Sequence, residues 1–234
     1  IDSKRYPPRG IHAQISKAKN EMINPKTYRA SAETILEEKV ADVYDEYQIR
    51  LLKSGAMDFD DLLFKTVEMF ASFPEILGHY QQRFKHVLVD EYQDTNPVQN
   101  QLVIQLGAES RNVCVVGDQD QSIYAFRSAD IRNIIDFENN FPDVTVVLLE
   151  QNYRSTKNIL DAANAVIENN FSRKPKRLWT EGNRGAQIIC YHADDEVDEA
   201  AWVLSQLKFL HETKDVDWKD TAVFYRTNAQ SRVL

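Results

Sequence analysis

Two adjacent carboxylates, Asp90 and Glu91, follow an uninterrupted apolar run at residues 87–89. A short run of this kind is typical of a strand buried on both faces of a parallel sheet. Asn96 and Pro97 then offer an N-cap and a first-turn proline for a following helix. Open α/β sheets bind ligands at the carboxyl ends of their strands. Asp90 could therefore hold Mg²⁺ on the β- and γ-phosphates of a nucleotide, while Glu91 orients or deprotonates the attacking water. The plainer alternative is a strand that ends in an acidic, solvated turn.

Four longer strings distinguish between these alternatives. They are VLVDEYQDTN (87–96), VVGDQDQSIYAFRSAD (115–130), LLEQNYRST (148–156) and VFYRTNAQSR (223–232). In this order they resemble motifs II, III, IV and IVa of the UvrD/PcrA/Rep-type superfamily 1 DNA helicases. The first 57 residues resemble part of the helical 1B subdomain of that family. The resemblance implies an ATP-dependent enzyme that moves 3′→5′ on single-stranded DNA and unwinds duplex DNA, with DNA-repair proteins as further partners.

The nucleotide site implied by the resemblance draws on both halves of the chain. Asp90 and Glu91 keep the roles in Mg²⁺ binding and water activation given above. Gln121 would hydrogen-bond the γ-phosphate and respond to its loss. Arg154 would reach the same phosphate across a cleft, and Tyr153 would stack on adenine. ATP and Mg²⁺ are the implied ligands. Without the resemblance, Tyr153 and Arg154 would be interpreted as a surface pair at a helix start.

The DNA contacts implied by the resemblance lie in motif III. Tyr124 and Phe126 would be stacking platforms for single-stranded bases, with each contact worth roughly 1–3 kcal/mol. Arg127 would contact a phosphate or a base face. Aromatic side chains on a loop are otherwise often core plugs. The family usually has Trp at the position of Phe126 and Gly at that of Ser128, and the smaller Phe ring predicts weaker stacking.

Composition sets the outer limits of the interpretation. Hydrophobic residues make up 43% and aromatic residues 10% of the chain, as in a globular protein. No apolar run approaches the roughly 18 residues of a membrane span, and no signal peptide opens the chain, so a cytoplasmic location is expected. Cys114 and Cys190 lie in apolar runs and are predicted to be buried and unpaired. The sequence has no CxxC and no paired His spacing, so no structural zinc site is predicted.

The charge distribution is uneven. A formal net charge of −8 argues by itself against nucleic-acid binding. Residues 1–30, however, carry seven basic residues against two acids. The basic residues are Lys4, Arg5, Arg9, Lys17, Lys19, Lys26 and Arg29. This segment is either an ordinary solvated face or a patch that follows the phosphates of duplex or single-stranded DNA.

The amino-terminal 57 residues are predicted to be helical. Apolar residues spaced by three or four positions form one helix face, and Gly55 is predicted to terminate that helix. These residues are Leu36, Val40, Val43, Tyr47 and Leu51. The next helix is predicted to be capped by Asp58 and to end before Pro74. Its expected inner face holds Phe59, Leu62, Leu63, Thr66 and Phe70. Asp60 and Asp61 are interpreted as first-turn charges favoured by the helix dipole.

From His86 onward, predicted strands alternate with predicted helices. The strands are 86–90, 112–116, 144–149, 187–191 and 221–225, the helices lie near 97–106, 130–139, 155–169 and 195–211, and residues 172–185 form a loop. That alternation predicts a parallel sheet with right-handed crossovers. The resemblance implies an α/β fold of the P-loop NTPase (RecA-like) type, in two partial lobes with an all-helical insertion at the amino end. The expected division is 1–57 for part of 1B, 58–149 for the carboxyl part of lobe 1A and 150–234 for the amino part of lobe 2A.

One expected motif is missing from the sequence. None of the seven glycines belongs to a GxxxxGK[ST] loop, although a phosphate cradle at a helix amino terminus is needed to hold ATP beside the carboxylates. We therefore expect an internal fragment that is inactive by itself, with motifs I and Ia before residue 1 and motifs V and VI after residue 234.

Two rival functions stay open. A metal-dependent nuclease could use Asp90, Glu91, Asp118 and Asp120. Such a site needs a lysine near the acids on the second strand, and residues 113–116 contain none. The other rival is a catalytically inert module that binds DNA or a protein.

Overall fold

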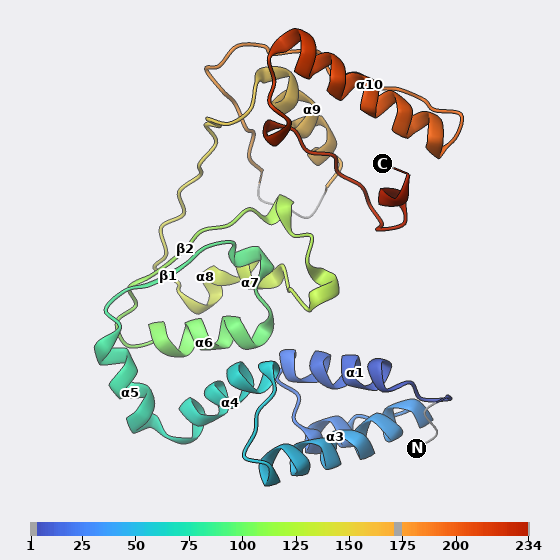
Figure 1. Cartoon of the computed structure of the whole chain (residues 1–234). Coiled ribbons are helices and arrows are strands. Elements are labelled where there is room, and N and C mark those ends of the chain that lie inside the picture. The colour runs from blue at the N-terminus through green and yellow to red at the C-terminus, as the bar shows by residue number, and fades with distance from the viewer. Residues whose placement is uncertain (1–3, 171–174, 234) are drawn as a thin grey trace. The chain divides into compact units, whose positions relative to one another are not determined.

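The computed structural model describes residues 4–170 and 175–233, which form two compact units (Figure 1). The first unit holds the described residues up to Leu148, together with Asn170 and Pro175. The second unit holds residues 149–169 and the described residues from Lys176 onward. None of the helices in these described ranges is long and apolar enough to cross a membrane.

The amino-terminal helices share one apolar core. They are α1 (Pro8–Asn20), α2 (Pro25–Ala30) and α3 (Ile35–Lys53). Their buried cluster contains Ile11, Ile15, Ala18, Val40 and Tyr44. Thr34 and Glu37 form a capping box that fixes the start of α3, and Gly55 follows its end with a φ of +58°. The predicted terminator is confirmed. The predicted apolar face is only partly right, because the buried stripe passes through Val40 and Tyr44 and leaves Leu36 49% exposed.

Helix α4 (Phe59–Ser72) follows, and α5 (Pro74–Arg83) begins at the proline that was expected to end it. Asp58 caps α4 as predicted, in a capping box with Asp61. The predicted inner face is only partly right: Phe70 is buried and Leu63 packs on the core, but Phe59 is 91% exposed and Leu62 56% exposed. The buried residues of α4 are Asp61, Phe64, Val67 and Phe70. Asp60 and Asp61 lie in the first turn of α4 as predicted, and Asp61 turns inward with this stripe.

The described residues of the first unit form a two-stranded parallel sheet, β1 (Val87–Val89) and β2 (Val113–Val115). Around it lie α6 (Pro97–Gly107), α7 (Arg132–Ile135) and α8 (Phe137–Asn140). The strand valines pack on a buried cluster of Tyr92, Val103, Phe137 and Phe141. Side chains alternate across a strand, so Leu88 and Cys114 point away from this cluster, and both are exposed. The predictions of burial on both faces and of a buried Cys114 are therefore wrong.

The other predicted strands are not observed. Residues 144–149, 187–191 and 221–225 are not assigned to strands, and many of their apolar side chains are exposed, such as Val147 (72%), Ile189 (66%) and Phe224 (93%). A strand needs a neighbour for its backbone N–H and C=O groups, and these runs have no ladder partner among the described residues. Cys190 is exposed as well, contrary to prediction. The predicted helix at 130–139 is divided into α7 and α8 at Asp136.

The second unit contains α9 (Lys157–Ile167) and α10 (Glu196–Lys214), close to their predicted ranges. Asp195 caps α10 by accepting from the N–H groups of Val197 (2.9 Å) and Asp198 (2.8 Å). A parallel bridge joins Gln151 to Trp179. Part of the predicted loop, residues 172–174, lies outside the described residues. Short 3₁₀ turns complete the two units at Tyr92–Asp94, Gln119–Gln121, Ala125–Arg127, Trp218–Asp220 and Gln230–Arg232.

Candidate functional site

The two carboxylates predicted to act on a nucleotide lie in a bulge at the end of β1. Val116 donates to Val89 O (2.8 Å) and accepts from Tyr92 N (2.9 Å). Two residues, Asp90 and Glu91, stand between these bonds, one more than a regular parallel ladder accommodates. Glu91 has left-handed backbone angles (φ 50°, ψ 44°), which cost roughly 1–2 kcal/mol in a residue other than glycine. Both carboxylates are exposed at the strand end, and a strained backbone of this kind is typical of functional sites.

Asp90 is the residue predicted to hold Mg²⁺. Its Oδ1 accepts a hydrogen bond from the Glu91 N–H (2.9 Å). The described parts of the chain contain no group of three or more His, Cys, Asp or Glu side chains able to hold a metal ion. Mg²⁺ in nucleotide sites uses one or two carboxylates besides phosphate oxygens and water, so Asp90 fits that ion.

A buried glutamine connects Glu91 to the second strand end. Gln93 is 1% exposed, and its Nε2 donates to Glu91 Oε2 (2.8 Å). Its Oε1 accepts from the backbone N–H of Asp118 (2.9 Å). A Cβ at Gly117 would lie 2.5 Å from Gln93 Oε1, so this approach requires glycine there. Sequence reasoning assigned Gln93 no role, because neither its spacing nor its residue type signals burial between two strand ends.

Asp94 is next to this glutamine. Partial burial, and secondarily the Glu91 carboxylate, raise its pKa above the ordinary carboxyl value. Its Oδ1 is buried without a hydrogen-bond partner among the described residues. The Asp94 N–H donates to Glu91 O (2.9 Å) and so helps to fix the turn.

Gln121, predicted to sense the γ-phosphate, follows β2 on a short 3₁₀ turn. Its side chain is exposed, and Nε2 donates to Asp118 Oδ2 (2.9 Å). The backbone N–H of the same Asp118 is held by Gln93, which in turn holds Glu91. The structure thus gathers Asp90, Glu91 and Gln121 around the carboxyl ends of β1 and β2, while the contact of Gln121 with a phosphate stays a prediction.

The aromatic residues of motif III form a pair of one half-buried ring, Tyr124, and one exposed ring, Phe126. The rings of Tyr124 and Phe126 are 6.0 Å apart and tilted by 40°. The Arg127 guanidinium lies over both rings, 5.2 Å and 5.5 Å from their centroids. Phe126 is 77% exposed, so it is not a core plug. An exposed ring with a cation over it can bind a flat, electron-rich group by stacking.

A groove of about 1180 Å³ lies between this loop and α1. Helix α1 contributes Ser16, Lys17 and Asn20 to its lining, and the loop contributes Phe126 and Arg127. Side chains of both charges therefore face the aromatic loop within one unit, since Glu21, Asp60 and Asp130 also line the groove and Lys17 pairs with Glu21 (3.8 Å).

Ser128 ends the aromatic turn with left-handed backbone angles (φ 66°, ψ 16°). Ser128→Gly is expected to raise the free energy of unfolding by up to about 1 kcal/mol, because relief of the left-handed strain exceeds the entropy that glycine adds to the unfolded chain. Urea unfolding of the chain would measure the change. Ser54→Gly is the control, since Ser54 has right-handed angles (φ −86°) and the substitution there should lower stability. Equal effects at the two positions, or a loss of stability in Ser128→Gly, would contradict this explanation.

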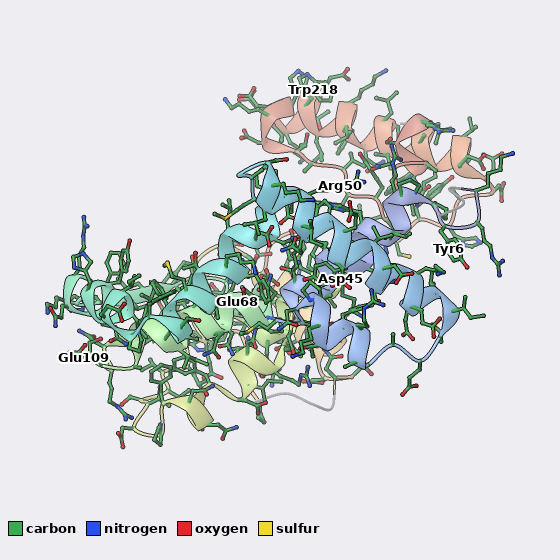
Figure 2. All side chains as sticks on the ribbon, turned by 90° about the horizontal axis from the view of Figure 1, so that it is seen from below. Tyr6, Asp45, Arg50, Glu68, Glu109 and Trp218 are labelled. Atoms are coloured by element: carbon green, nitrogen blue, oxygen red, sulfur yellow. The ribbon has the colours of Figure 1, made fainter. Side chains whose placement is uncertain are left out.

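Part of the predicted basic patch of residues 1–30 is neutralised by acids. Lys19 is fully buried between Asp58 and Asp61, so it cannot follow a phosphate backbone. Arg29 pairs with Asp42 (3.1 Å) and with Asp45 (2.6 Å), which Figure 2 labels on α3. The Arg29 pairs are those of an ordinary solvated face, whereas Lys19 belongs to the protein interior.

Tyr153 and Arg154 belong to the second unit. Tyr153 is 86% exposed, and its hydroxyl donates to Gln151 Oε1 (2.9 Å). Asn152 Oδ1 accepts from the backbone N–H groups of Arg154 (2.9 Å) and Ser155 (2.7 Å). This local turn presents both candidate side chains at the surface of their own unit, as their roles at a nucleotide would require.

Comparison with known proteins covers the whole chain. Residues 1–142 match the family described as UvrD/REP helicase N-terminal domain, and residues 147–234 match the UvrD-like helicase C-terminal domain. The chain is 51% identical over 232 residues to the ATP-dependent DNA helicase PcrA of Leuconostoc citreum, covering 99% of this chain and 31% of that protein. It is 50% identical over 234 residues to PcrA of Bacillus subtilis (strain 168), covering 100% of this chain and 32% of that protein.

A third relative is the ATP-dependent DNA helicase UvrD1 of Mycobacterium bovis, 51% identical over 244 aligned residues, with 100% of this chain and 32% of that protein covered. The chain therefore spans about a third of the length of the curated relatives that it matches. With a family match over 142 of its residues and about half of its positions identical to these relatives, the chain belongs to the UvrD/REP helicase family.

Proposed function

We propose that this chain is a segment of an ATP-dependent DNA helicase that moves 3′→5′ along single-stranded DNA and unwinds duplex DNA in repair or replication. The names of the relatives support the ATP-dependent and DNA-directed parts of this proposal. The first unit would supply the helical 1B part and the carboxyl part of a RecA-like lobe 1A. The second unit would supply the beginning of lobe 2A.

Glu91 would orient and deprotonate the attacking water, and Gln121 would contact the γ-phosphate. Arg154 would stabilise the transferring phosphoryl group, while Tyr153 stacks on adenine. Mg²⁺ held by Asp90 would neutralise charge on the β- and γ-phosphates. Together these side chains would bind the nucleotide, orient the attacking water and accept its proton. Because the sequence contains no GxxxxGK[ST] loop, the 234-residue chain alone would not hydrolyse ATP.

The observation that carries the proposal is the exposed ring of Phe126. It lines a groove with Arg127 over its face, in the same unit as the two carboxylates. Exposed aromatic rings beside cationic side chains are the usual platform for single-stranded bases. A protein that only hydrolysed nucleotides would have no use for such a surface.

Phe126→Ala in the longer helicase is expected to weaken single-strand binding by roughly 1–3 kcal/mol, because a stacked base loses its ring partner. Phe126→Trp should hold or tighten binding, since a larger ring covers more of the base. Fluorescence titration with a labelled oligonucleotide at fixed salt would measure both changes. Nucleotide affinity should change little.

Phe73→Ala is the matched control. Phe73 is 50% exposed at the junction of α4 and α5 and does not line the groove. Its loss should leave DNA affinity unchanged. A large fall in melting temperature in both Phe126 variants, with unchanged DNA affinity in the folded fraction, would make Phe126 a structural residue. DNA binding without any DNA-stimulated ATP hydrolysis would instead favour the inert binding module.

A further inference from the structure

Gln93 occupies a position that the proposed roles leave without a function. It is a polar side chain with 1% exposure, and both ends of its amide are used. Nε2 donates to Glu91, and Oε1 accepts from the Asp118 N–H. Its backbone O also accepts from Ser122 Oγ (3.4 Å). Gln93 is thus bonded to both residues that flank the turn carrying Gln121.

The two segments held by Gln93 have different proposed tasks. Glu91 is the group assigned to the attacking water. The turn at Asp118–Ser122 leads within two residues to Tyr124, the first ring of the aromatic pair. A displacement of this turn by bound DNA would move the Oε1 end of a buried, fully bonded amide. The Nε2 end of the same rigid group would then move against the Glu91 carboxylate.

We propose that Gln93 is a positioning residue that holds the Glu91 carboxylate and links its orientation to the occupancy of the aromatic groove. This role rests on the proposed function. Gln93 does not touch the nucleotide or the DNA in this account; it acts through Glu91 on one side and through the Asp118–Ser122 turn on the other.

Gly117 provides a second way to disturb the same link. A Cβ at this position would lie 2.5 Å from Gln93 Oε1, 2.8 Å from Ile134 Cδ1 and 3.1 Å from the Tyr92 backbone N. The Tyr92 backbone cannot yield easily, whereas a glutamine amide can rotate away. Gly117→Ala is therefore expected to displace the Gln93 side chain without removing it.

The test measures the steady-state kinetics of ATP hydrolysis by the full-length helicase, with and without single-stranded DNA. Gln93→Met keeps the length of the side chain and removes its hydrogen bonds with Glu91 and Asp118, together with a longer one from Nε2 to Asp94 Oδ2 (3.4 Å). Gln93→Glu keeps the acceptor for Asp118 and replaces the donor to Glu91 with a carboxylate. Both variants should lower the DNA-stimulated kcat at least tenfold, while KM for ATP changes less than about threefold, because the contacts with the nucleotide are unchanged.

Gly117→Ala should reproduce this split between kcat and KM. The double variant Gly117→Ala/Gln93→Met should be no slower than the slower single variant, since both changes break one link. Gln105→Met is the control. Gln105 is a half-buried glutamine in the same unit whose Nε2 donates to Val67 O (3.2 Å), and its loss should leave the DNA stimulation intact.

Retention of more than half of the wild-type stimulation by Gln93→Met or Gln93→Glu would overturn the proposed role. So would a fall in kcat that matches the loss of folded protein in a thermal melt, or an equal fall in Gln105→Met. If Gln93→Met does not fold, Gly117→Ala and Gln93→Glu decide the question by the same criteria. A wild-type protein without DNA-stimulated hydrolysis would overturn the proposed function and this role together, whereas a stimulated wild type with unimpaired variants would overturn this role alone.

Discussion

Glu91→Gln is expected to lower kcat for ATP hydrolysis by about 10²–10⁴ in the longer helicase while ATP binding is retained. The amide keeps the shape of the side chain and can still accept a hydrogen bond, but it cannot take a proton from the attacking water. Glu91 is exposed at the carboxyl end of β1 and held by Gln93, so the substitution disturbs little of the packing. Stopped-flow nucleotide binding and steady-state hydrolysis at saturating DNA would separate the two effects.

Glu109→Gln is the matched control for this experiment. Glu109, labelled in Figure 2, is exposed just beyond the end of α6. Its substitution by Gln therefore removes one negative charge, as Glu91→Gln does, but outside the site. Its hydrolysis rate should stay near that of the wild type. Near-native kcat in Glu91→Gln would show that another group activates the water. Turnover by the 234-residue chain alone, abolished by Glu91→Gln, would show that this chain holds the triphosphate without a GxxxxGK[ST] loop.

The parts of the structure that could be predicted from the sequence depend on neighbouring residues. Asp58 and Asn96 cap their helices through backbone N–H groups three residues away, and the sequence shows both the cap and the helix that follows. Gly55 was predictable for the same reason, since the end of α3 requires a left-handed residue. The position of Asp90 and Glu91 at a strand end followed from the apolar run before them.

What could not be predicted depends on residues that are distant in sequence. Whether Leu88 is buried depends on what covers the second face of the sheet, and the run of residues 87–89 carries no information about that cover. The bulge at Glu91 exists because Val116 bonds to Val89 and Tyr92, a register that only the folded pair defines. The segments 144–149, 187–191 and 221–225 have strand-like composition, but composition supplies no ladder partner.

Lys19 shows most clearly how tertiary contacts decide the role of a residue. In the sequence it belongs to a basic segment suited to phosphates. In the structure its side chain is 0% exposed and lies 2.6 Å from Asp58 Oδ2 and 3.0 Å from Asp61 Oδ1. Tyr47 OH also donates to Asp58 Oδ2 (2.9 Å). The neighbouring Asn20 donates to Asp60 Oδ1 (3.1 Å), so α1 is fastened to the first turn of α4 by two successive residues.

Lys19→Met is expected to lower the free energy of unfolding by about 3–5 kcal/mol, because it leaves the nearly buried Asp61 without its cation. A loss of this size is a large part of the roughly 5–15 kcal/mol typical of folded domains. The midpoint of urea unfolding of the 234-residue chain would measure it. Lys65→Met is the control, since the pair of Lys65 with Glu68 (2.6 Å) is solvent-exposed and its loss should cost at most about 1 kcal/mol.

The pH dependence gives a second measurement of the same cluster. Although partial burial acts to raise the pKa of Asp58, hydrogen bonds from Lys19, the Asp61 N–H and Tyr47 hold it below the ordinary value of 3.8. A carboxyl group whose pKa is lower in the folded than in the unfolded protein stabilises the fold when the pH is above its unfolded-state pKa. That contribution is lost as the pH falls through its folded-state pKa. The difference in stability between wild type and Lys19→Met should therefore be fully present near neutral pH and narrow below about pH 4.

The double variant Lys19→Met/Asp61→Asn should recover part of the loss, because it removes the uncompensated charge. A cost under about 1 kcal/mol for Lys19→Met, or a difference that does not change between pH 7 and pH 3, would show that the fold does not depend on this ion cluster.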